Sequence, residues 1–75
     1  MTEKRFFWDG EELTIMEGFQ LAVIGFNKVD EGYEMETSTR CWVDDKTLLK
    51  EGKRPVTEDE AIELVFDKYG IDLGA

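Results

Sequence analysis

Alternation of apolar and polar positions predicts extended strands over the first half of the chain. Between residues 33 and 43 one face carries Tyr33, Met35, Thr37, Thr39, Cys41 and Val43, and the other carries Glu34, Glu36, Ser38, Arg40 and Trp42. A two-residue period of this kind predicts a strand with one buried face and one face in water. Residues 19–27 are apolar on both faces, as expected of a central strand. The short connection through Gly32 predicts that these two strands pair antiparallel.

An earlier hairpin is predicted from the aromatic N-terminal segment. Residues 5–8 are rich in aromatic side chains, and Asp9-Gly10 is a strong signal for a two-residue turn. Residues 12–16 then form the second strand. We expect the aromatic strand to lie at an edge of the sheet or beside the central strand. Because three consecutive aromatic residues cannot all face one core, at least one of them should face outward, unless a second layer or a dimer partner covers it.

Helix signals are explicit near the C-terminus. Thr57 with Glu60 three residues later predicts a capping box, and Gly70 is placed to end the helix in a left-handed conformation. Between these stops an apolar stripe recurs at three- and four-residue spacing, made of Ala61, Ile62, Val65, Phe66 and Tyr69. Residues 47–51 are compatible with one helical turn, and residues 53–55 read as a basic linker.

These elements predict the α+β class. We expect a small twisted antiparallel sheet of about four strands, with one C-terminal helix packed on one face, in the order β-β-β-β-α. The whole chain, residues 1–75, is expected to form a single domain.

The charge balance narrows the kind of partner. Eighteen acidic and nine basic residues give a formal net charge of −9, and there is no histidine. Nucleic acids and anionic membranes attract basic proteins, so direct binding to either is disfavoured and a basic protein partner is favoured. The first residues lack the apolar stretch of a signal peptide, and no segment approaches the roughly 20 apolar residues of a membrane span. A cytoplasmic location is therefore expected.

The residue inventory argues against catalysis. Without histidine and with one cysteine, Cys41, the common general base and multi-cysteine zinc sites are excluded. Glycine-rich phosphate loops are absent from the sequence, and Cys41 suits a buried, reduced thiol. The adjacent acids at 44–45 and 58–60 are explained by turn formation and by the helix dipole. We expect a non-enzymatic protein without a cofactor or a metal site.

Carboxylates recur at regular intervals on two predicted elements. Asp59, Glu63 and Asp67 would lie on one helix face about 6 Å apart. Glu34 and Glu36 would point the same way from one strand, about 6.8 Å apart. Successive DNA phosphates are separated by roughly 6 to 7 Å. These rows are candidates for contacting Arg and Lys side chains of a partner, and a solvated acidic face is the alternative. Trp42 and Trp8 are candidate anchors at such an interface.

In size, charge and compact α+β build the chain resembles the small acidic inhibitors encoded by phages and other mobile elements, which include anti-CRISPR proteins and DNA mimics. The resemblance maps no individual residue. It implies an inhibitor that blocks the basic nucleic-acid-binding surface of a host defence or DNA/RNA-binding complex. We expect the chain to be a monomer or a homodimer. Two alternatives stay open. One is a structural or regulatory subunit that pairs through the aromatic edge strand, and the other is an immunity protein or antitoxin that caps a basic toxin.

Overall fold

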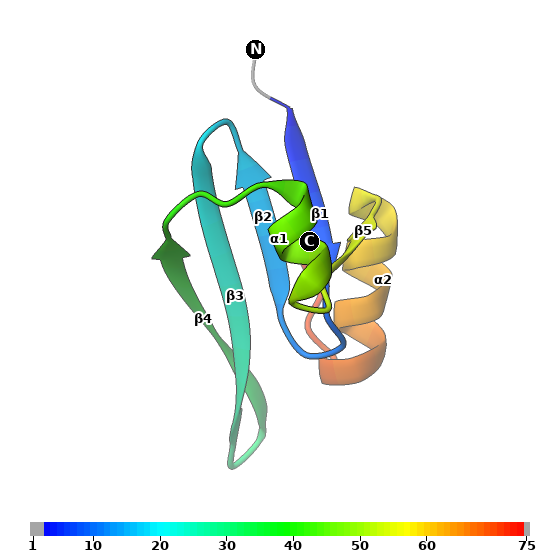
Figure 1. Cartoon of the computed structure of the whole chain (residues 1–75). Coiled ribbons are helices and arrows are strands. Elements are labelled where there is room, and N and C mark those ends of the chain that lie inside the picture. The colour runs from blue at the N-terminus through cyan, green and yellow to red at the C-terminus, as the bar shows by residue number, and fades with distance from the viewer. Residues whose placement is uncertain (1–2, 75) are drawn as a thin grey trace.

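The computed structural model describes residues 3–74 and contains one antiparallel sheet and two helices (Figure 1). The sheet has five strands in the order β4-β3-β2-β1-β5. The elements are β1 (Lys4–Trp8), β2 (Leu13–Glu17), β3 (Gln20–Val29), β4 (Gly32–Arg40), α1 (Asp45–Lys50), β5 (Arg54–Val56) and α2 (Glu58–Tyr69). The expected α+β class and C-terminal helix are confirmed, whereas the described chain adds a fifth strand and a second helix. Residues 1, 2 and 75 of the expected domain lie outside the described residues.

The connection between β1 and β2 is longer than predicted. Trp8 pairs with Leu13, so the four residues 9–12 form the turn and the two-residue Asp9-Gly10 hairpin is wrong. One carboxylate oxygen of Asp9 accepts hydrogen bonds from the backbone amides of Glu11 at 2.8 Å and Glu12 at 2.7 Å. These bonds favour the four-residue turn, because the short Asp9 side chain takes the place of backbone acceptors for the two amides.

The segment predicted as a basic linker is a strand. β5 pairs antiparallel with residues 6–8 of β1, which places β1 inside the sheet and leaves β4 and β5 at its edges. The aromatic strand is therefore not at an edge; it lies beside β2, the middle strand of the five, and not beside β3, which the sequence predicted as central. Side chains alternate across β1, so Phe7 faces one side of the sheet while Phe6 and Trp8 face the other. Each side is covered by a helix, and for this reason none of the three aromatic side chains is left fully in water.

Two layers cover the two faces of the sheet. On the α1 side, Leu48 packs with Phe7, Met16 and Leu21. On the α2 side, Ala61 and Val65 pack with Trp8 and Leu13. The prediction of a single covered face is corrected, because residues 45–50 form a helix and not one isolated turn. Its N-cap is Asp44, whose side chain accepts a hydrogen bond from the Thr47 amide at 3.0 Å.

The helix α2 begins and ends as its sequence predicts. The Thr57 hydroxyl accepts from the Glu60 amide at 3.1 Å, and the Glu60 side chain accepts from the Thr57 amide at 3.3 Å. Gly70 adopts a left-handed conformation with φ of 72°. Ala61 and Val65 are buried, but Phe66 is 54% exposed, so its place in the buried stripe is wrong. Neither helix of the described chain has the length and apolar content to cross a membrane.

The β3–β4 hairpin is the least covered part of the sheet. Its pairing is continuous from Leu21 with Arg40 to Val29 with Gly32, which confirms the predicted antiparallel pair. The far end of the hairpin projects away from both helices (Figure 1). The prediction that one face of this strand is core is wrong, because Tyr33 is 37% and Met35 49% exposed at the sheet edge. Cys41, predicted to be buried, is exposed.

Candidate functional site: the acidic face of α2

Three carboxylates of α2 form the most regular charged feature of the described surface. Asp59, Glu63 and Asp67 are all exposed. Their spacing of four residues places them on the helix side opposite the buried Ala61 and Val65. We call Asp59, Glu63 and Asp67 the α2 acidic row. The structure thus brings these three sequence-predicted residues together on one face.

The α2 acidic row makes no ion pair among residues 3–74. The ion pairs of the described chain join Arg5 with Asp45, Arg40 with Glu51 at 2.7 Å, and Lys53 with Asp9 at 3.3 Å. Within α2 there are five acidic residues and one basic residue, Lys68. The Lys68 ammonium donates to the carbonyl oxygen of Gly10 in the β1–β2 turn and not to a carboxylate. The negative charge of the row is therefore not neutralised within the described structure.

Packing at its C-terminal end holds α2 in a fixed position. The Tyr69 hydroxyl donates to the Glu11 carbonyl at 2.8 Å, and the Tyr69 ring stacks on Phe26 with a centroid distance of 4.3 Å. Tyr33 meets the same ring edge-on at 4.8 Å. The pKa of Tyr69 is raised, mainly by burial and next by the charge of Glu11 and other nearby groups. Its phenol therefore stays protonated and can donate this hydrogen bond. These contacts hold the C-terminal end of α2 against the β1–β2 turn and the β3–β4 hairpin.

The two predicted rows do not form one surface. Glu36 of β4 lies opposite Gly25 of β3, in the register that places it on the α1 side with Ser38, Val23 and Phe7. Glu34 shares that face, since it is two residues away. The α2 acidic row is on the other side of the sheet, on a helix that packs mainly on β1 and whose Tyr69 reaches Tyr33 of β4. Glu34 and Glu36 therefore face away from the row on α2.

Of the two candidate tryptophans, one is in the core. Trp8 is 5% exposed and packs against α2, so its proposed role as a surface anchor is wrong. Trp42 is 44% exposed and meets Phe19 edge-to-face, with ring centroids 5.7 Å apart. Phe19 is 82% exposed because it lies in the two-residue turn Gly18-Phe19 between β2 and β3, at the end of the sheet. The turn signal at Glu17-Gly18 was available in the sequence and could have identified this exposed ring.

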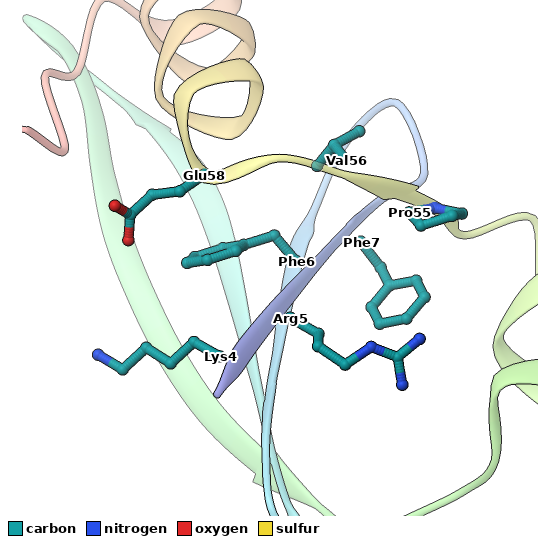
Figure 2. A pocket seen from close by; sticks show the side chains of 7 residues that line it. All are labelled: Lys4, Arg5, Phe6, Phe7, Pro55, Val56 and Glu58. Atoms are coloured by element: carbon teal, nitrogen blue, oxygen red, sulfur yellow. The ribbon is translucent and has the colours of Figure 1, made fainter. Parts of the chain in front are cut away.

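A hollow of about 440 Å³ lies beside β1 where β5 ends (Figure 2). Arg5 and Phe7 extend to one side of the strand, while Lys4 and Phe6 extend to the side of Glu58 (Figure 2). The Arg5 guanidinium is already bound by Asp45. The other charged side chains that line the hollow are Lys4 and Glu58. Because these two charges have opposite signs, the hollow does not extend the α2 acidic row.

The described residues contain no group of three or more His, Cys, Asp or Glu side chains arranged to hold a metal ion. Comparison with known proteins adds no assignment: no protein-family model, curated protein or solved structure matches the chain. What the protein binds must therefore be argued from its own surface.

Proposed function

We propose that the protein is a small acidic inhibitor that places the α2 acidic row in the basic nucleic-acid-binding surface of another protein. The carboxylates of Asp59, Glu63 and Asp67 act as phosphate surrogates toward Arg and Lys side chains. No bond is made or broken, and no cofactor is needed. The source class favoured by the size and charge of the chain is a phage or another mobile element, acting against a host defence or DNA/RNA-binding complex in the manner of anti-CRISPR proteins or DNA mimics.

The observation that carries the proposal is that none of the three carboxylates of the row forms an ion pair in the described structure. Like charges four residues apart on a helix cost a few tenths of a kcal/mol per pair. The chain accepts this cost although its bases form ion pairs with other acids at Asp9, Asp45 and Glu51. A basic partner would convert the repulsion into attraction.

Spacing and support strengthen the argument. Successive carboxylates of the row are about 6 Å apart along the helix, close to the roughly 6 to 7 Å between DNA phosphates. The capped ends of α2 and the bond from Tyr69 to Glu11 fix the row before binding. A rigid surface loses little conformational freedom on association, which favours affinity. Trp42 and Phe19 lie at the opposite end of the sheet from the β3–β4 turn and form a separate aromatic surface.

The test is capture from a cell lysate by three immobilised proteins. The wild type should retain a basic nucleic-acid-binding protein, and Asp59→Lys with Glu63→Lys should lose it. The matched control is Asp30→Lys with Glu31→Lys at the β3–β4 turn, which changes the net charge equally at exposed positions. The control should retain the partner, and raised salt should release it from the wild type. Equal retention by all three proteins, or equal loss in both variants, would contradict a role for this particular row.

A further inference from the structure

The two edges of the sheet are protected to different degrees. β5 is three residues long and contains Pro55, and short length and proline both prevent pairing with another strand. β4 is nine residues long, and its sequence contains no proline. Its register with β3 is continuous over nine residue pairs without a bulge. Within residues 3–74, β4 pairs with β3 alone, so its outer edge presents unpaired backbone donors and acceptors.

The outer edge of β4 is also accessible. Every side chain from Gly32 to Thr39 is exposed, and Arg40 is half-buried. After Arg40 the chain crosses back over the sheet toward α1, away from the free edge (Figure 1). Neither helix lies along that edge (Figure 1). A second strand can therefore approach β4 without displacing another element.

Charges on β4 determine which strand fits. Its α1-side face carries Glu34, Glu36, Ser38 and Arg40, so acids occupy one half and a base the other. In an antiparallel pair, directly opposed residues share a face and contact each other. A strand with the same charge order, run in the opposite direction, therefore places acid against base. β4 of a second copy of this chain is such a strand.

We propose that two copies of this chain pair through β4, antiparallel and about a two-fold axis, to form one continuous sheet. A two-fold axis makes the same surface of each copy contact its counterpart. With the axis at Thr37, residues 34–40 of both copies are paired. Glu34 of each copy then faces Arg40 of the other, whose guanidinium also binds Glu51 of its own chain and would be shared between the two carboxylates.

The alternative registers are distinguished by charge. With the axis at Glu36 the overlap of the strands is largest, but Glu36 faces its own copy and like charges directly opposed are unfavourable. Moving the axis to Thr37 removes that contact and places Glu36 opposite Ser38. On the α2-side face, the same register places Thr37 of one copy opposite Thr37 of the other, and Met35 of each copy opposite Thr39 of the other. The half-exposed Met35 side chain thereby gains a neighbour, and Thr–Thr pairs are favourable in sheets.

This pairing is independent of the proposed inhibitor function. The α2 acidic row lies on the side of α2 opposite the buried Ala61 and Val65, and it is not part of the outer edge of β4 that would be paired in the dimer. Two rows would then be displayed by one assembly. Failure of dimerisation would leave the proposed partner binding unaffected, and the reverse holds as well.

Sedimentation velocity over a concentration series tests the proposal. The wild type should change from one to two chain masses as its concentration rises into the high micromolar range. Glu34→Arg should weaken dimerisation by about tenfold, because two attractive cross-strand pairs become repulsive. Glu34 makes no side-chain hydrogen bond in the described structure, so this variant should fold normally. Asp67→Arg changes the charge equally on α2 and should dimerise like the wild type.

A mixing experiment tests the register. At a concentration where about half of the wild type is dimeric, Glu34→Arg and Arg40→Glu should each be mainly monomeric alone, because each homodimer opposes two like pairs. Mixed together they should form a heterodimer, in which Arg faces Glu at both positions. Circular dichroism confirms that Arg40→Glu, which loses its bond to Glu51, is folded. A wild type that stays monomeric at all concentrations, or a Glu34→Arg variant that dimerises as well as the wild type, would overturn the proposal.

Discussion

Two sets of carboxylates in this protein differ in what they bind within the described structure. Asp9, Asp44, Asp45 and Glu51 each bind a cation or a backbone amide. Asp9 and Asp45 connect elements that are distant in sequence, Glu51 binds Arg40 of β4, and Asp44 caps α1. The α2 acidic row binds no cation within the described residues and faces water. The same residue types thus hold the fold in one region and remain free for a partner in the other. Substitutions should separate the two sets by their effects on folding.

The strongest structural carboxylate is Asp9. One of its oxygens bonds the amides of Glu11 and Glu12, and the other lies 3.3 Å from the ammonium of the buried Lys53. Asp9→Ala would leave that ammonium without its partner, so the free energy of unfolding should fall by about 3 kcal/mol. Urea denaturation measures the change. Asp67→Ala is the control and should stay within about 0.5 kcal/mol of the wild type. Equal effects of the two substitutions would remove the distinction between the two sets.

Lowering the pH should reproduce part of the loss of stability that is predicted for Asp9→Ala. Burial opposes ionisation of Asp9, but the amide hydrogen bonds and the charge of Lys53 outweigh it and hold its pKa below 3.8. Hydrogen bonds from Thr47 and Arg5 lower the pKa of Asp44 and Asp45 in the same way. Because these pKa values are lower in the folded state, the unfolded chain binds protons first as the pH falls. Stability should be lost progressively below about pH 4.

Between pH 6 and 8 the free energy of unfolding should be constant, because the chain has no histidine. Urea denaturation at a series of pH values measures both regimes. A stability maximum below about pH 4 would mean that relief of acidic repulsion outweighs the loss of these bonds.

The smallest expected effect on folding is a gain in stability and not a loss. Glu63→Lys replaces two like-charge neighbours, Asp59 and Asp67, by two attractive ones on the same helix face. The free energy of unfolding should rise by a few tenths of a kcal/mol, up to about 0.5. Partner capture should nevertheless be lost. A destabilised variant would show that Glu63 has a structural role.

Local signals in the sequence predicted some elements well. The capping box at Thr57 and Glu60, the left-handed Gly70 and the pairing of β3 with β4 depend on residues near one another in the chain, and all are confirmed. β5 was missed because a three-residue strand containing Pro55 has no alternation to detect. Once β5 pairs with β1, the aromatic strand becomes interior and Trp8 is buried.

The candidate site was predictable only in part. The spacing of Asp59, Glu63 and Asp67 follows from helix geometry and is reproduced. Whether this row meets Glu34 and Glu36 depends on strand order and on which face each helix covers. Both are long-range properties that no local pattern encodes. Phe19 is exposed because it lies in the turn between β2 and β3, and Phe66 because it is turned away from the side of α2 that carries the buried Ala61 and Val65.

Competition with nucleic acid tests the central claim most directly. The protein retained by the immobilised wild-type chain is challenged with duplex DNA and with single-stranded RNA oligonucleotides of mixed sequence. If the α2 acidic row occupies a nucleic-acid groove, one of these should release the retained protein in proportion to its concentration, at constant ionic strength. A retained protein that binds the oligonucleotide while staying on the immobilised chain would contradict the account, as would the capture of no nucleic-acid-binding protein.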